Sequence, residues 1–260
     1  MSTFKILALG DVVGQGAVKY LENNLRKKIS EYGADLTVIN AENAAVGNGL
    51  DVSSARALLG AGADVLTSGN HIYKHSSLHS FLEESPYLIR PMNYPAECPG
   101  NGYTVFNAAG IRILIMNVSG NVYANEPMNC PFESVERALT RERDSYDIAV
   151  LDVHAEATSE KAAIARYFDG RISVVYGTHT HVQTADARIL PKGCGFITDL
   201  GMCGPDDSIL GVDPKCIINK MRLHMPQRFN VSEGPITATG ALFEIDLSTR
   251  RAVSVTAVKF

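Results

Sequence analysis

Polar residues that can do chemistry stand directly after apolar, strand-like runs at five places in the chain. They are Asp11, Glu42, Asn43, Asn70, His71, His154, His179 and His181. In open α/β sheets the chemistry lies at the carboxyl ends of strands. Carboxylate, amide and imidazole groups from several strand ends can bind metal ions there. We therefore interpret these residues as one dispersed site.

The segment Gly177-Thr178-His179-Thr180-His181 is the most specific of the five. Its glycine allows a sharp exit from a strand, and two histidines at positions i and i+2 can approach metal ions from one loop. Asn70-His71 is also informative, because an amide is uncommon at the end of an apolar strand unless its oxygen binds something. The adjacent His71 can donate a proton near neutral pH.

Other interpretations of single residues stay open. Asp11 alone could cap a helix or a turn, and Glu42 alone could lie in a solvated loop. A dinucleotide-binding loop is disfavoured, because Lys19 stands where Gly-x-Gly-x-x-Gly would need its last glycine. His75 and His79 have the i, i+4 spacing of a helical zinc site, but the segment around them looks exposed and we assign them no metal.

Taken together, seven groups form a mixed oxygen and nitrogen ligand set: Asp11, Glu42, Asn43, Asn70, His154, His179 and His181. Seven are too many for one zinc and suit two ions. Two metals about 3.5–4 Å apart can bind a bridging hydroxide and clamp a phosphoryl group. Ligand type alone does not choose among iron, manganese and zinc, and we expect iron ahead of the other two.

The elements that must position these groups alternate along the chain. Apolar runs at 5–9, 36–40, 65–67, 148–153 and 172–176 predict buried strands. Periodicity predicts helices over 16–32, 53–60, 76–84, 134–143 and 159–168, with Gly33 as a C-cap and Ser53, Ser134 and Ser159 as N-caps. A hairpin is predicted over 103–118, and a strand-rich end follows, with one helix at 215–223. These βα repeats with a strand-rich end predict two sheets packed face to face and flanked by helices.

Size and composition set further bounds. With 260 residues and no linker or low-complexity stretch, we expect residues 1–260 to form a single domain. A net charge of −4 argues against an extended nucleic-acid surface. No run approaches the ~20 apolar residues that span a bilayer, so we expect a cytoplasmic protein without a membrane partner. The five cysteines are odd in number and lack Cys-x-x-Cys spacing, so we interpret them as small buried apolar residues.

The order Gly-Asp, Glu-Asn, Gly-Asn-His, His and Gly-x-His-x-His resembles the calcineurin-like metallophosphoesterases, and more narrowly their bacterial YmdB-type branch. The similarity is densest in residues 152–161, 177–186 and 201–205. It implies a four-layer αββα sandwich of two mixed sheets flanked by helices. It also implies that Asp11, Asn43 and His181 hold one metal, that Asn70, His154 and His179 hold the second, and that Glu42 bridges them. His71 would be the general acid.

The chain departs from the wider superfamily at several positions. Val13 stands where Asp-x-His is usual, so Asn43 would replace that histidine, as in the YmdB-type branch. Ile72-Tyr73-Lys74 stands where Thr-Trp-Asp is common, which bears on substrate preference. Cys194 and Cys203 occupy positions where threonine or another small residue is expected.

The resemblance implies a binuclear metal-dependent phosphodiesterase. We expect a metal-bridging hydroxide to attack a small phosphodiester, a 2′,3′-cyclic nucleotide or 3′,5′-cAMP, with His71 protonating the leaving oxygen. The alternatives are a phosphomonoesterase or nucleotidase on the same site, and a metal-binding regulatory protein with little turnover. Members of the family are often oligomeric, so a homo-oligomer is also expected.

Overall fold

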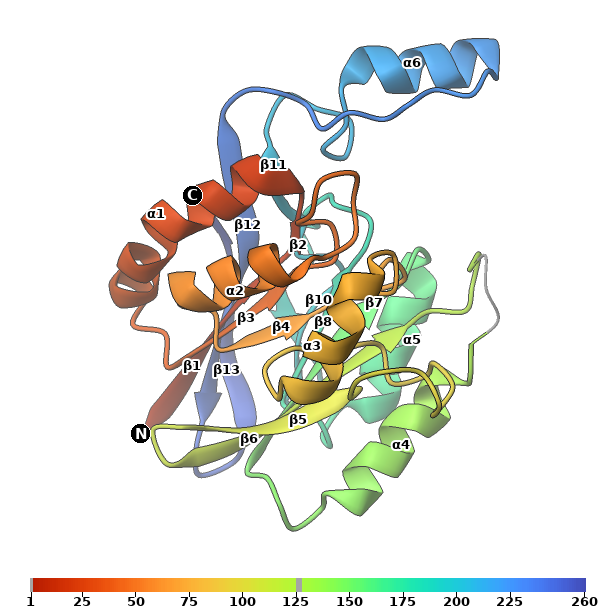
Figure 1. The fold of residues 1–260 in the computed structure, drawn as a ribbon. Coiled ribbons are helices and arrows are strands. Elements are labelled where there is room, and N and C mark those ends of the chain that lie inside the picture. Colours follow the sequence, from red (N-terminus) through yellow and green to blue (C-terminus); the bar gives the residue numbers. More distant parts are fainter. Residues whose placement is uncertain (1, 125–127) are drawn as a thin grey trace.

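Two β-sheets lie face to face between two layers of helices in the computed structural model (Figure 1), which describes residues 2–124 and 128–260. Within these residues the first sheet has seven strands, in the order β2-β11-β12-β1-β3-β4 with β13 beside β12. They are β1 (Thr3–Leu9), β2 (Asp11–Val12), β3 (Leu36–Asn40), β4 (Val65–Thr67), β11 (Met202–Pro205), β12 (Ile236–Asp246) and β13 (Arg251–Lys259).

The second sheet runs β5-β6-β7-β8-β10-β9. Its strands are β5 (Tyr103–Ala108), β6 (Ile111–Ser119), β7 (Ile148–His154), β8 (Val174–Thr178), β9 (Arg188–Ile189) and β10 (Gly195–Ile197). Both sheets contain parallel and antiparallel pairs. The predicted α/β sandwich of two mixed sheets is therefore confirmed.

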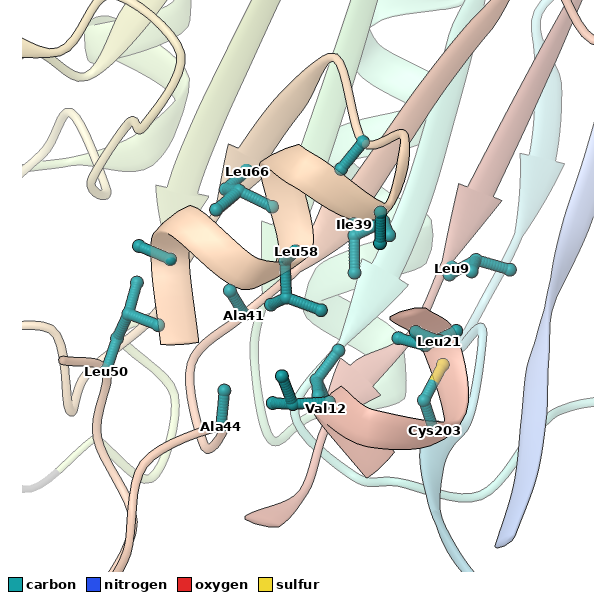
Figure 2. Packing of buried hydrophobic residues seen from close by; sticks show 14 of the residues in the cluster. Leu9, Val12, Leu21, Ile39, Ala41, Ala44, Leu50, Leu58, Leu66 and Cys203 are labelled. Atoms are coloured by element: carbon teal, nitrogen blue, oxygen red, sulfur yellow. The ribbon is translucent and has the colours of Figure 1, made fainter. Parts of the chain in front are cut away.

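Helices cover the outer face of each sheet. Apolar residues at helical spacing in α1 (Gly14–Tyr32) and α2 (Val52–Ala61) pack on the first sheet, so that Leu21 and Leu58 meet strand residues such as Ile39 (Figure 2). On the second sheet, α4 (Pro131–Arg141) and α5 (Thr158–Phe168) bury their apolar faces in the same way.

The core between the sheets is built from alternate residues of the facing strands, among them Ile6 of β1, Ile115 of β6 and Phe243 of β12. The predicted alternation of β12 is confirmed, because Ala241, Phe243 and Ile245 all lie in this core. Since β1, β3 and β4 run parallel, as do β6, β7 and β8, their carboxyl ends gather at one edge of each sheet. This is where the polar clusters emerge.

Three predicted N-caps are wrong. Asp51, not Ser53, caps α2, with its carboxylate accepting from the backbone N–H of Ser54. Helix α4 begins at Pro131, which makes Ser134 an internal residue, and α5 begins at Thr158, one residue before Ser159. The C-cap at Gly33 is confirmed by its left-handed φ of 62°.

Several boundaries also differ from the sequence prediction. The short strands β2 and β11 were not predicted, since two and four residues are too few to show alternation. Strand β8 starts two residues later than expected, because Ile172 pairs with Asp169 in an isolated bridge. The segment after His75 forms a 3₁₀ turn, Ser76–Leu78, before α3 (His79–Glu84).

A long arm leaves the sandwich between β11 and β12 and carries α6 (Pro214–Leu223) away from the body (Figure 1). No residue of α6 is buried.

Across the described residues, every helix is too short or too polar to cross a bilayer. All five cysteines are free. Cys194 and Cys203 are buried as expected, whereas Cys98 and Cys216 are partly exposed and Cys130 is exposed, contrary to expectation.

Candidate metal centre

The first sheet supplies Asp11, the first residue of β2. Gly10 brings this strand close to Gly201, since a Cβ at position 10 would lie 1.9 Å from the Gly201 carbonyl oxygen. The backbone N–H of Asp11 donates to that same oxygen. The close approach leaves the Asp11 side chain fully buried at the edge of the sheet.

Glu42 and Asn43 follow β3, and Asn70 and His71 follow β4. Gly69 leaves room for them, because a Cβ there would lie 1.8 Å from Glu42 Oε2 and 2.1 Å from His154 Nε2. A glycine is thus required by space at this position, not by an unusual backbone angle.

The second sheet supplies the three remaining histidines. His154 is the last residue of β7, and His179 and His181 follow β8. The φ angles of His179 and His181 are 95° and 61°, in the region that favours glycine. The loop between β8 and β9 therefore turns sharply at these two histidines. The predicted sharp exit at Gly177 is wrong, because Gly177 lies inside β8 and has no positive φ.

One group of side chains surrounds the Nε2 nitrogen of His154. Glu42 Oε2 lies 2.9 Å from it, His179 Nδ1 3.0 Å and Asn70 Oδ1 3.1 Å. A second group surrounds His181 Nε2, with Asn43 Nδ2 at 3.4 Å and Asp11 Oδ1 at 3.7 Å. The structure therefore brings together all seven predicted ligands, in two adjacent groups.

His71 lies beside both groups. Its Nδ1 nitrogen is 2.8 Å from Glu42 Oε1 and 3.0 Å from Asn43 Oδ1. The ring is about one-third exposed, whereas Glu42 is buried. Among the four histidines of the site, His71 has the most exposed side chain, at 34% against 29% for His179.

Three carboxylate oxygens in the centre are buried without a hydrogen-bond donor: Asp11 Oδ1 and both oxygens of Glu42. The imidazoles near them lie at ion-pair distance but not in hydrogen-bonding geometry. Unsatisfied buried acceptors are costly, and bound cations remove that cost. One ligand atom each from Glu42, His154 and His179 lies within 4.8 Å of the others, so the donor set fits metal ions.

Burial and charge shift the ionisation of these groups in opposite directions. Burial raises the pKa of Asp11 above its usual range. Burial also acts to raise the pKa of Glu42, but the neighbouring His154 and His71 imidazoles outweigh it and hold that pKa well below its usual range. Burial acts to lower the pKa of His154, yet the carboxylates of Glu42 and Asp11 raise it to about 9.

His179 behaves differently from His154. Burial, followed by the charge of the neighbouring His154, lowers the pKa of His179 to about 3. Its ring is therefore neutral across the physiological range and has a nitrogen lone pair to offer. This difference follows from position, because Glu42 Oε2 lies 2.9 Å from His154 Nε2, whereas its effect on the pKa of His179 is smaller than that of the neighbouring His154.

A buried polar network beneath His154 was not predicted from the sequence. Thr178 Oγ1 lies 2.9 Å from His154 Nδ1 and donates to Asp152 Oδ1 at 2.7 Å. Asp152 also accepts from Thr67 and Asn40. Such partners orient a histidine ring and fix which nitrogen faces a metal. The available signal was polar residues at positions 40, 152 and 178, inside otherwise apolar strand ends.

His75 and His79, which were assigned no metal, are each only partly exposed, although their segment was expected to be exposed. His75 Nε2 lies 2.9 Å from the Asn48 carbonyl oxygen, and His79 packs edge-on against Tyr73. Of the unusual tripeptide after His71, Ile72 is fully buried and the Tyr73 hydroxyl donates to Pro99. Lys74, which contacts Asn48, is the exposed member of the three.

Comparison with known proteins identifies a matching family and a similar enzyme. Residues 7–258 match the family model described as YmdB-like protein. The chain is 41% identical over 251 residues to the 2′,3′-cyclic-nucleotide 2′-phosphodiesterase of Bacillus subtilis (strain 168), covering 96% of this chain and 95% of that protein.

Two solved structures have the same fold as this chain. A hypothetical protein from Thermus thermophilus superposes with a TM-score of 0.91 at 36% identity, covering 99% of both chains. A protein described as a novel phosphatase from Mycoplasma pneumoniae gives a TM-score of 0.94 at 34% identity, covering 100% of this chain and 94% of that one.

The two-sheet sandwich with carboxylates, amides and histidines at its edge defines the calcineurin-like metallophosphoesterase class. Within that class, the chain belongs to the YmdB-like family, as the sequence resemblance indicated.

Proposed function

We propose that this protein is a binuclear metal-dependent phosphodiesterase that hydrolyses 2′,3′-cyclic nucleotides. One observation carries the proposal: three buried carboxylate oxygens of Asp11 and Glu42 lack hydrogen-bond donors and face the imidazoles of His71, His154 and His181. The name of the Bacillus subtilis relative supports the substrate class.

The two groups of side chains support a division of the ligands. Asp11, Asn43 and His181 would hold one ion, Asn70, His154 and His179 the other, and Glu42 would bridge them. Bound ions would supply positive charge for the phosphoryl oxygens and lower the pKa of a water molecule. We propose iron ahead of manganese or zinc.

His71 would deliver the proton that the leaving ribose oxygen needs. Its Nδ1 nitrogen faces Glu42 and Asn43, so the Nε2 nitrogen on the opposite side of the ring is left for the substrate. An alkoxide is a poor leaving group, and a positioned acid typically contributes about 10²–10⁴-fold in rate.

The test is metal analysis of the anaerobically purified protein combined with hydrolysis of 2′,3′-cyclic nucleotides and 3′,5′-cAMP. We expect about two ions per chain and turnover of the 2′,3′-cyclic substrates. Bound metal without hydrolysis of any phosphodiester would instead support a regulatory protein. A chain that binds no metal under these conditions would contradict the proposal outright.

Monoester hydrolysis is the second candidate, because the Mycoplasma pneumoniae relative is described as a phosphatase. A comparison of bis-p-nitrophenyl phosphate with p-nitrophenyl phosphate separates the two. We expect the diester to be the better substrate, and a clear preference for the monoester would favour the phosphatase.

A further inference from the structure

Residues 179–181 carry two of the proposed ligands and form what we call the histidine loop. The backbone of this loop is held in an unfavourable conformation. His179 and His181 both have positive φ, and Thr180 lies between them. Residues other than glycine adopt this region only where the surrounding structure imposes it. Something outside the loop must therefore hold it.

Asp199, which follows β10, is the group that contacts the middle of the loop. Its Oδ2 oxygen accepts from Thr180 Oγ1 at 2.6 Å and from the Thr180 backbone N–H at 3.3 Å. Its Oδ1 oxygen accepts from the Gly201 N–H at 2.8 Å. The Gly201 carbonyl in turn accepts from the N–H of Asp11. One buried carboxylate thus connects the histidine loop to the strand beside Asp11.

The charge of Asp199 is balanced by Lys161 from helix α5. Lys161 Nζ lies 2.6 Å from Asp199 Oδ2 and 3.4 Å from Thr180 Oγ1, and both charged side chains are fully buried. The lysine stem crosses strand β8 at Gly177, where a Cβ would lie 2.6 Å from Lys161 Cδ. The absence of a side chain at Gly177 is what lets the ammonium group reach the loop from behind.

A buried ion pair is weak evidence for stabilisation, because desolvating both charges costs about as much as their attraction returns. The position of this pair suggests a different role. It lies directly behind the loop that carries His179 and His181, and the proposed function gives no task to either charge.

We infer that Lys161 and Asp199 form a positioning pair for the metal centre. They fix Thr180 so that His179 and His181 point at their separate groups of ligands. This inference rests on the proposed function, since it concerns how the chain prepares the histidines for metal ions. Neither residue touches the substrate or the reacting atoms in this role.

Thr180→Val tests the inference most directly. The change keeps the shape of the side chain and removes the hydroxyl donor to Asp199, which leaves only the longer bond from the backbone N–H. We expect metal affinity, measured by calorimetric titration of the metal-depleted protein with Mn²⁺, to fall about 10–100-fold, as when orienting partners of ligands are removed. The Tm of the metal-free variant should stay close to that of the wild type.

Ser248→Ala is the control. Ser248 Oγ donates to Asp246 at 2.7 Å, which is also a bond from a hydroxyl to a carboxylate, but in the turn between β12 and β13, beside the start of β1 and not its end. It should bind Mn²⁺ as the wild type does. Wild-type affinity in Thr180→Val would overturn the inference, whereas a wild type that binds no Mn²⁺ would refute the proposed function instead.

A double variant, Lys161→Met/Asp199→Leu, gives a second test. Apolar side chains of similar volume often replace a buried ion pair without loss of stability, but they cannot hold Thr180. We expect a folded protein with weakened Mn²⁺ binding. A folded double variant that binds Mn²⁺ normally would count against the positioning role, and Thr180→Val decides the question if the double variant does not fold.

Discussion

The Nδ1 nitrogen of His71 lies 2.8 Å from Oε1 of Glu42. The contact joins a partly exposed imidazole to a fully buried carboxylate and fixes which face of the ring is turned inwards. It thereby separates the task of His71 from that of the three other histidines of the site, each of which is itself a proposed metal ligand.

Replacing His71 by alanine should slow the reaction without removing metal. We expect the hydrolysis of a 2′,3′-cyclic nucleotide to fall about 10²–10⁴-fold. The loss should be much smaller with bis-p-nitrophenyl phosphate, because nitrophenolate leaves without a proton. Steady-state rates with both substrates, together with metal content, provide the measurement.

His75→Ala is the control for that experiment, since His75 contacts Asn48 and lies outside the metal centre. It should be nearly fully active on both substrates. Loss of metal from His71→Ala, or an equal loss of rate on both substrates, would contradict the assignment of His71 as the general acid.

Asp11→Asn should uncouple stability from metal binding. The substitution removes a buried negative charge whose Oδ1 oxygen has no donor, and the amide oxygen can still accept from the His179 N–H. We expect the metal-free variant to be at least as stable as the metal-free wild type. The wild type should gain about 2.7 kcal/mol per site at metal concentrations 100-fold above Kd, and the variant should gain clearly less.

Thermal unfolding with and without Mn²⁺ checks this prediction. Asp35→Asn, a change at an exposed carboxylate that accepts from Lys5 N–H, should keep the full response to metal. A normal metal-induced rise of Tm in Asp11→Asn would rule out Asp11 as a ligand.

Gly69→Ala should abolish metal binding by a steric clash alone. A Cβ at this position would overlap Glu42 Oε2 and His154 Nε2, and both side chains would have to move. We expect loss of metal and activity in a protein that still folds, as judged by circular dichroism. Gly60→Ala in helix α2 meets nothing within 4 Å and should be active, with a stability equal to the wild type or up to about 1 kcal/mol higher.

Asp147 gives a prediction about acid stability. Hydrogen bonds from Arg112 lower the pKa of Asp147 to about 2. Because the folded pKa is depressed, the stabilisation is present above the unfolded pKa near 4 and is lost as the pH falls through about 2. Asp147→Asn should therefore be less stable than the wild type at pH 7, by under about 1 kcal/mol since the pair is exposed, and this difference should shrink below pH 4.

Urea unfolding at several pH values checks this window. Asp144→Asn is a suitable control, because the Asp144 side chain is almost fully exposed and its contact with Arg143 is long. It should match the wild type at every pH. A stability difference for Asp147→Asn that is the same at pH 3 and pH 7 would exclude the Arg112–Asp147 pair as its source.

The convergence of the proposed ligands at one edge was predictable from the sequence because these residues obey a rule of position. Each proposed ligand follows an apolar run, and parallel strands bring their carboxyl ends to one edge. Asp11 and His181 are far apart in the chain, yet their side chains lie 3.7 Å apart at the edge of the sandwich. Strand order was not needed to foresee that the clusters would meet.

The groups that support the ligands follow no such rule. Lys161 and Asp199 are separated by 38 residues and lie on a helix and a loop, so nothing local indicates that they pair. The Asp152–Thr178 contact likewise depends on the register of β7 and β8. Capping errors such as Ser53 for Asp51 arose because neighbouring polar residues are equally good caps, and tertiary packing decides which one begins the helix.

The two sheets contribute to the centre in nearly equal shares: Asp11, Glu42, Asn43 and Asn70 come from the first, and His154, His179 and His181 from the second. No part of the chain that folds early during synthesis can therefore hold both ions. The last proposed ligand leaves the ribosome only after residue 181 of 260, and Asp199 later still. For the proposed binuclear centre, metal loading would then be a late step that requires the two sheets to have docked.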